Sequence, residues 1–149
     1  MALTVSKTFR FEAAHVLPGY VGNCSRIHGH SYKFTVTLGG ELQEVGSNSQ
    51  MIMDFSELKR IVQDRIISQL DHMFLSANRL ELPAHLFETF RIWGDFARSV
   101  VVLPIARTTA EELVRWIFTT LSKDLSNTPT YLVSVTLWET EDSSATYTG

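Results

Sequence analysis

Residues 24–38 read Cys-Ser-Arg-Ile-His-Gly-His-Ser-Tyr-Lys-Phe-Thr-Val-Thr-Leu, and the second half of this stretch has the pattern of a β-strand. From His28 to Leu38 every second residue is a histidine or a large apolar residue, whereas the residues between them are small, polar or charged. This period of two predicts a strand with one buried face. Because residues two apart in a strand point to the same side, His28 and His30 can bind one metal ion together. Gly29 has no Cβ and lets the backbone pass close to that ion.

A second alternating segment runs from Leu3 to Phe11, with a break at Lys7, and its phase continues to His15. We expect this strand to pair with the strand that starts at His28, which brings a third imidazole to the same place. Three histidines would form a zinc site with an open fourth position, the arrangement of catalytic zinc. The simpler alternative is three half-buried histidines that only satisfy hydrogen bonds.

Cys24, the single cysteine, precedes this histidine pair and allows three interpretations. It is an inert loop residue, or the fourth ligand of a closed structural zinc site, or a free thiol beside the metal. In the last case Zn²⁺ and Arg26 would lower the pKa of the thiol, so that it could act as a base or nucleophile. Spacing alone does not separate the last two interpretations.

Two amphipathic helices are predicted further along the chain. Asp54 and Glu57 stand at the positions of a capping box, and apolar residues then recur at helical spacing to about Leu70. Thr108 and Glu111 form a second capping box, ahead of another helical pattern. Further strands are predicted at residues 51–53 and 131–137. Two more, at residues 86–93 and 96–103, are predicted to form a hairpin. The tail from residue 141 is expected to be loose.

The order of elements predicts an α+β fold in a single domain, residues 1–149. Adjacent strands can form an antiparallel sheet, and both helices can cover one of its faces, with the hairpin inserted between them. Large residues on the other face, such as Trp138, suggest that copies of the chain associate.

Composition narrows the function classes. Apolar residues make up 44% of the chain and charged residues 19%, which is ordinary for a globular domain. The net charge of −3 leaves no basic surface for nucleic acid. One cysteine fits a reducing compartment, and no signal peptide or membrane-spanning apolar run is present. We therefore expect a cytoplasmic protein that binds neither nucleic acid nor membrane.

Three further residues are candidates for chemistry. Asp71 directly precedes His72, and a carboxylate can orient an imidazole for proton transfer; the alternative, favoured on the residues alone, is a histidine at a helix C-terminus. Glu139 continues an apolar strand face, where an unpaired carboxylate is costly to bury. It either binds a planar ligand edge that has two N–H donors or simply reaches solvent at the strand end.

Taken together, these residues resemble the 6-pyruvoyl tetrahydropterin synthase family, including its bacterial branch, the 6-carboxytetrahydropterin synthases of queuosine biosynthesis. The similar pieces follow the order of the family and span most of the chain. They are residues 11–15 (Phe-Glu-Ala-Ala-His), 24–30, 54–59 (Asp-Phe-Ser-Glu-Leu-Lys), 70–72 (Leu-Asp-His), 109–111 (Thr-Ala-Glu) and 139–140 (Glu-Thr).

The resemblance implies the tunnelling fold (T-fold), in which three copies form a barrel and two trimers stack as a hexamer with sites at subunit interfaces. It also implies a role for each candidate residue. By resemblance, His15, His28 and His30 hold zinc, Cys24, Asp71 and His72 are catalytic, and Glu139, Thr108 and Thr109 bind the pterin.

The resemblance implies a zinc-dependent lyase that acts on a small-molecule substrate, 7,8-dihydroneopterin triphosphate. The implied products are 6-carboxytetrahydropterin, acetaldehyde and triphosphate. The three residues between Cys24 and His28 are a short spacing that resembles the carboxy branch. One alternative is the pyruvoyl enzyme, which stops after triphosphate elimination and internal redox. Another is a non-catalytic zinc-binding oligomer in which Cys24 is the fourth ligand.

Overall fold

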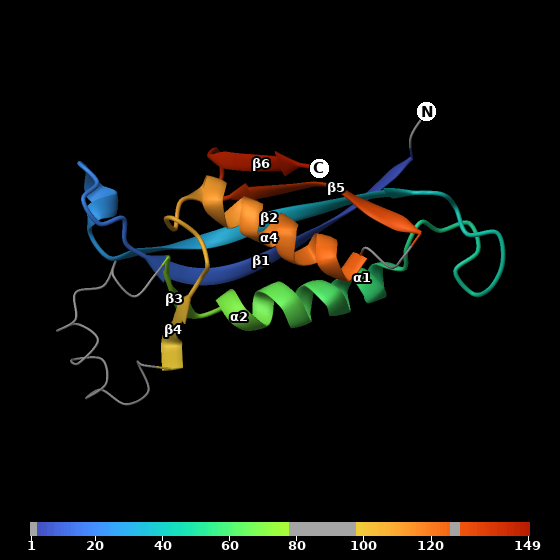
Figure 1. Cartoon of the computed structure of the whole chain (residues 1–149), viewed down its shortest axis with the longest axis horizontal. Helices are drawn as coiled ribbons and strands as arrows, with labels where there is room; N and C mark the ends of the chain where they lie inside the picture. The colour runs from blue at the N-terminus through green and yellow to red at the C-terminus, as the bar shows by residue number, and fades with distance from the viewer. Residues whose placement is uncertain (1–2, 78–97, 126–128) are drawn as a thin grey trace.

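A computed structural model describes residues 3–77, 98–125 and 129–149, and the strands in these ranges form one sheet (Figure 1). The strand order across the sheet is β4-β3-β1-β2-β5-β6. The strands are β1 (Thr4–His15), β2 (His28–Gly40), β3 (Met73–Ser76), β4 (Val100–Val102), β5 (Thr130–Trp138) and β6 (Ser144–Thr148). The two longest, β1 and β2, pair antiparallel over their length, as predicted.

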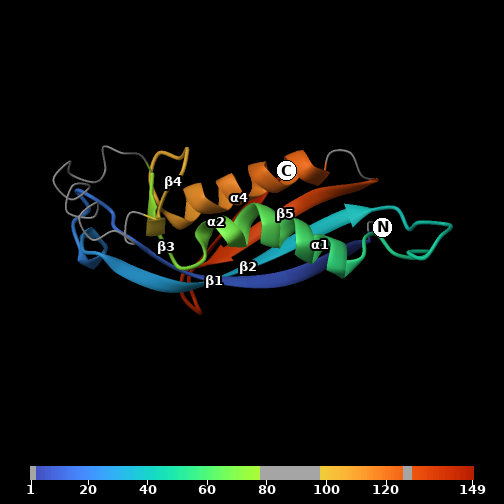
Figure 2. The same ribbon diagram turned by 90° about the horizontal axis from the view of Figure 1, so that it is seen from below.

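The helices lie side by side on one face of the curved sheet (Figures 1 and 2). The first helical segment consists of α1 (Phe55–Val62), a π-helical turn (Gln63–Ile67) and α2 (Ser68–Leu70), and the second helix is α4 (Ala110–Leu125). Asp54 caps α1 by accepting a hydrogen bond from the amide of Ser56 at 2.6 Å. The predicted helix start at Asp54, its end near Leu70 and the packing of both helices on one face are confirmed.

The core lies between the helices and the inward face of the sheet. Phe11 and Tyr32, which are opposite each other in β1 and β2, stack with ring centroids 4.8 Å apart. Apolar side chains of α1 and α4, such as Leu58 and Ile117, are fully buried against them. Each such side chain contributes about 1.5–3 kcal/mol on burial. This packing fixes the strand phase that turns His15, His28 and His30 toward the helices.

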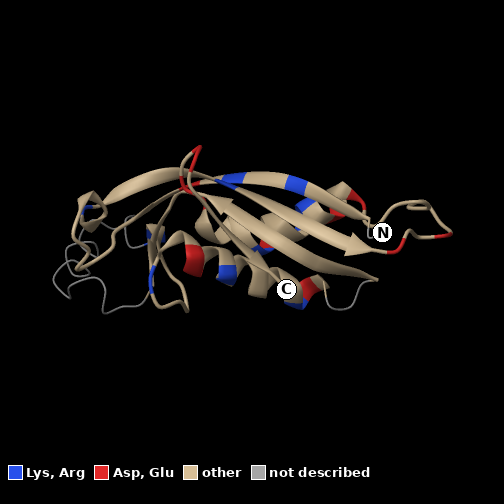
Figure 3. Ribbon diagram, turned by 90° about the horizontal axis from the view of Figure 1, so that it is seen from above, with Lys and Arg blue, Asp and Glu red and all other residues tan. Residues whose placement is uncertain are grey.

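The outward face of the sheet is lined by hydroxyl side chains paired across strands. The bonded oxygens are 2.9 Å apart in Ser6 and Thr37, and 2.8 Å apart in Thr8 and Thr35. In Figure 3 the strands carry few charged positions, and an acidic turn connects β5 and β6. The hydroxyl pairs follow from the alternation that places the apolar residues inside.

The predicted phase of the last strand is wrong in its first half. Tyr131 and Val133 were expected to share the buried face with Val135, but Tyr131 is 55% exposed and Leu132 is buried. The register between β2 and β5 shifts between Thr37 and Leu38. A β-bulge inserts one residue and reverses the side-chain alternation on one side of it.

Three other predictions are also corrected. Residues 144–148, expected to be loose, form the edge strand β6, which pairs antiparallel with β5. Residues 51–53 are not a strand, since neighbours Ile52 and Met53 are both buried and a strand would place them on opposite faces. The helix cap is Thr109 rather than Thr108, because the Thr109 hydroxyl accepts the hydrogen bond from the amide of Glu112.

The sheet is mixed rather than wholly antiparallel. β3 follows the first helical segment and pairs parallel with β1, and β4 pairs parallel with β3. β2 runs antiparallel to β1, and the helical segment carries the chain back along the sheet, so β3 runs in the same direction as β1 (Figure 1). The first strand of the predicted hairpin, 86–93, lies outside the described residues. No helix in the described ranges is long and apolar enough to cross a bilayer.

Candidate active site and metal centre

Three histidines meet where β1 ends and β2 begins. His15 is the register partner of His28, and His30 lies two residues along on the same face. The ring centroid of His15 lies 4.5 Å from that of His28 and 5.2 Å from that of His30. One nitrogen from each ring lies within 4.8 Å of the others, so the three could hold one metal ion.

Backbone carbonyls determine which nitrogen of two rings is available. His15 Nδ1 lies 2.8 Å from the carbonyl oxygen of Thr108, and His28 Nδ1 lies 2.8 Å from that of Arg26. A carbonyl only accepts, so each Nδ1 carries the proton and each neutral ring presents a lone pair at Nε2. These two Nε2 atoms are 3.0 Å apart. Two facing lone pairs repel unless a cation lies between them, and the carbonyls orient the rings as in known zinc sites.

Burial favours the neutral form of two rings of this cluster, those of His15 and His30. His15 is only 1% exposed, and burial lowers its pKa to about 4, with smaller contributions from the neighbouring imidazoles. Burial also lowers the pKa of His30, and His28 adds to the effect. Metal binding requires neutral imidazole, which is the form that burial favours for these two rings.

The lowered pKa of His15 predicts an acid-sensitive fold for the metal-free protein. The unfolded chain takes up a proton near pH 6.5, whereas the folded protein does so only near pH 4. This stability is therefore complete above pH 6.5 and is lost as the pH falls toward 4, by roughly 3 kcal/mol in all. Urea unfolding at several pH values measures it. In H15Q the slope over this interval should be much smaller, and an unchanged slope would contradict the account.

Cys24 is carried by a short ordered loop between β1 and β2. The amide of Leu17 donates to the carbonyl of Cys24 at 2.8 Å and closes the loop. Cys24 is half-buried and belongs to a 3-10 turn (Asn23–Ser25). It lines a cleft of about 290 Å³ together with the three histidines. The other residues lining the cleft are Leu17, Tyr20, Thr109, Ala110, Glu111, Glu139, Ser143, Ser144 and Ala145.

Glu139 lines this cleft directly after β5, beside His30. Burial raises the pKa of its carboxyl group, and the negative charge of Glu111 raises it further. The hydroxyl of Tyr32 is buried near the carboxyl group of Glu139, and burial and the charge of Glu139 raise the pKa of Tyr32. A ligand that brings N–H donors to Glu139 would relieve the cost of burying this charge.

Thr108 and Thr109 occupy different positions beside the cleft. Thr109 lines it, whereas the side chain of Thr108 is fully buried and its hydroxyl points to the carbonyl of Val16 at 3.5 Å. The backbone of Thr108 instead orients the histidine cluster through its carbonyl bond to His15.

Asp71 and His72 form a pair in a different hollow. Asp71 Oδ2 lies 3.0 Å from His72 Nδ1, and Asp71 Oδ1 accepts the amide of Glu12 at 2.9 Å, which lowers the pKa of Asp71. His72 has a positive φ of 61°. His72 lines a cavity of about 590 Å³ that also borders His30 but not Cys24. One chain therefore does not bring His72 and Cys24 into one cleft.

The model of the family described as 6-pyruvoyl tetrahydropterin synthase matches residues 4–149, nearly the whole chain. The chain belongs to the 6-pyruvoyl tetrahydropterin synthase family. Its T-fold is shared with a structure from Wolinella succinogenes, with a TM-score of 0.78, 23% identity and coverage of 100% and 99% of the two chains. The Caenorhabditis elegans 6-pyruvoyl tetrahydropterin synthase gives 0.69 at 25% identity, with 100% and 96% covered.

Curated members of this family with similar sequences carry the name of the carboxy branch. The 6-carboxy-5,6,7,8-tetrahydropterin synthase of Haemophilus influenzae is 36% identical over 143 residues, 96% of each chain. The enzyme of that name from Aquifex aeolicus is 28% identical and covers 99% of this chain and 98% of its own. Membership supports an enzyme of the pterin synthase family.

The residues not predicted as site residues include Glu111 and Tyr20, which line the cleft, and Tyr32, which lies beside His30. Glu111 was interpreted only as a capping residue, although the register of α4 turns it toward the cleft. Tyr32 shares the strand phase of His28 and His30, so the alternation could have found it. Nothing in the sequence pattern points to Tyr20, which reaches the cleft only through the fold of its loop.

Proposed function

We propose that this protein is a zinc-dependent lyase that converts 7,8-dihydroneopterin triphosphate to 6-carboxytetrahydropterin, with loss of acetaldehyde and triphosphate. One observation carries the proposal: the histidine cluster, Cys24 and the half-buried carboxylate of Glu139 line the same cleft. The names of the similar curated relatives support the carboxy branch.

The donor set fits zinc. His15, His28 and His30 would hold the ion through nitrogens that face one another, and two of the rings are fixed by backbone carbonyls. Bound zinc would polarise the side-chain oxygens of the substrate and make neighbouring protons easier to remove. Three protein ligands leave a position for the substrate.

Cys24 is the proposed base for a proton on the substrate side chain. It stands in the same cleft as the histidines, and a thiolate there can take a proton and return it. Asp71 and His72 are the proposed second proton-transfer pair, in which the carboxylate holds the imidazole in a defined orientation.

A second copy of the chain would complete the site. Because His72 and Cys24 line different hollows of one chain, both can act on one substrate only if the partner copy supplies one of them. We therefore propose a homo-oligomer, a trimer or hexamer, with sites at its subunit interfaces. Light scattering measures the mass, and an active monomer would contradict this arrangement.

Glu139 is the proposed anchor for the amino-pyrimidinone edge of the pterin, which presents two adjacent N–H donors. A carboxylate can accept both, and such charge-assisted bonds are strong. In E139Q one acceptor becomes an NH₂ donor that faces another donor, so we expect KM to rise about tenfold to hundredfold. Steady-state kinetics measures this, with E141Q on the exposed turn as the control. An unchanged KM would remove Glu139 from the pterin site.

The proposed reaction is tested by identifying its products. Purified protein is incubated with zinc and 7,8-dihydroneopterin triphosphate, and the products are analysed by mass spectrometry. We expect 6-carboxytetrahydropterin and acetaldehyde in equal amounts. Pyruvoyl tetrahydropterin would assign the protein to the other branch of the family, and unchanged substrate with zinc fully bound would contradict both activities.

A further inference from the structure

The loop that carries Cys24, residues 17–24, begins with a turn that leaves one carbonyl unused. Leu17 accepts a hydrogen bond from the amide of Tyr20 at 3.2 Å, with Pro18 and Gly19 at the two central positions. Gly19 has a φ of 72°, so the turn has the form of a type II turn. The central peptide group takes no part in the turn's own bond, and the Pro18 carbonyl is left to accept a bond from elsewhere.

Arg107 supplies that bond from a distant part of the chain. Its guanidinium donates to the Pro18 carbonyl at 2.8 Å. Within the described ranges, the other side-chain hydrogen bond to residues 17–24 comes from the adjacent Ser25, whose hydroxyl donates to the Gly22 carbonyl, so Arg107 is the contact from a distant part of the chain; it has no ion pair there. Arg107 is half-buried and has no carboxylate partner in the described ranges, so no ion pair explains its position. Its hydrogen bond to the loop is therefore the contact that accounts for it.

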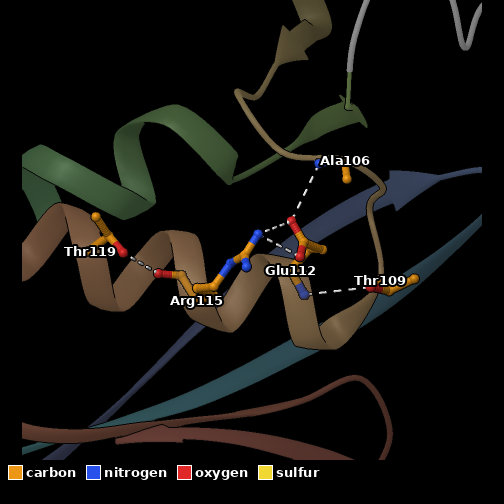
Figure 4. A network of polar contacts seen from close by, with 5 residues as sticks. All are labelled: Ala106, Thr109, Glu112, Arg115 and Thr119. Atoms are coloured by element: carbon orange, nitrogen blue, oxygen red, sulfur yellow. Dashed lines mark hydrogen bonds and ion pairs between the residues drawn. The ribbon is translucent and has the colours of Figure 1, made fainter. Parts of the chain in front are cut away.

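The backbone on both sides of Arg107 is fixed by hydrogen bonds. Figure 4 shows the neighbouring network, in which the amide of Ala106 donates to Glu112 Oε2 at 3.3 Å and Glu112 is paired with Arg115 at 2.7 Å. The hydroxyl of Thr109 caps α4 by accepting the amide of Glu112. On the other side of Arg107, Thr108 is bonded through its carbonyl to His15. Arg107 therefore projects from a segment that is fixed both to the helix and to the metal centre.

We propose that Arg107 is a positioning residue that holds the Cys24 loop at a fixed distance from the histidine cluster. The bond path runs from Arg107 to Pro18, through the turn to Leu17, and from the Leu17 amide to the Cys24 carbonyl. A thiol that moves a proton must keep its place to within a fraction of an ångström. This inference rests on the proposed function, in which Cys24 is the base.

The test compares R107M, R107K and the control R60M in the zinc-loaded protein. Met keeps the length of the apolar stem but cannot donate, Lys keeps a donor, and Arg60 lies exposed on α1 beside Asp64. Turnover of 7,8-dihydroneopterin triphosphate gives kcat and KM. The rate of Cys24 alkylation by iodoacetamide, read by mass spectrometry, reports on the loop without turnover, since Cys24 is the single cysteine.

For R107M we expect kcat to fall about tenfold, as for the loss of one charge-assisted bond, with KM and zinc content unchanged. Cys24 should be alkylated several-fold faster, while R107K and R60M stay close to wild type. A rise in KM with unchanged alkylation would mean that Arg107 binds the substrate phosphates, and loss of zinc would mean a general structural role; either overturns the proposal. If wild type shows no turnover, the proposed function fails, and the alkylation rates still decide the role of Arg107.

Discussion

Replacing Cys24 by alanine is expected to abolish turnover and leave zinc bound. Cys24 lines the cleft with the three histidines, yet those rings provide three ligands without it. General-base catalysis contributes about 10²–10⁴-fold in rate, so we expect C24A to lower kcat about 10³-fold. Metal analysis of the purified variant, together with single-turnover kinetics, measures both quantities.

The same variant separates the catalytic site from the non-catalytic zinc oligomer. If Cys24 were a fourth ligand, C24A would lose zinc affinity and thermal stability along with any activity. C24S serves as a second variant: it keeps the side-chain size, but its hydroxyl has too high a pKa to act as the thiolate does. Wild-type turnover in C24A would remove Cys24 from the mechanism.

Replacing His30 by alanine is expected to remove the metal and all measurable activity. His30 is the ring that faces the other two from the next inward position of β2. Loss of an orienting partner alone weakens metal sites about tenfold to hundredfold, and loss of a ligand should cost at least a hundredfold in zinc affinity. Competition with a chromophoric chelator measures that affinity.

His72 is the matched control for this experiment. It is a histidine paired with a carboxylate in the adjoining hollow, and it is 80% exposed. H72A should therefore keep zinc at full stoichiometry while it loses turnover. If H30A kept wild-type zinc affinity, or if H72A lost zinc, the assignment of ligands would be wrong.

The alternation of apolar residues was enough to predict the strands that bring the three histidines together. His15, His28 and His30 share strand phase with Phe11 and Tyr32, and burial of that face fixes the register. A one-residue slip would have turned every histidine outward, so the pattern strongly limits the alternatives. The helix start at Asp54 was predictable for a similarly local reason, since a carboxylate caps the first turn.

The features that could not be predicted depend on distant contacts. The edge strand β6 consists mostly of small and polar residues. It forms because its backbone pairs with that of β5 and because Tyr147 packs against Phe118 of α4. The bulge in β5 has no mark in the sequence. The bond from Arg107 to Pro18 joins residues 89 positions apart. The separation of His72 from Cys24 is likewise a property of the folded chain, although both were predicted as candidates.

The central claim is that three histidines hold zinc while Cys24 remains free. X-ray absorption at the zinc edge of the zinc-loaded protein tests it most directly. The account predicts nitrogen and oxygen neighbours at about 2.0 Å and no sulfur neighbour. A sulfur neighbour at about 2.3 Å would show Cys24 bound to the metal and would contradict the account, because the site would then be closed.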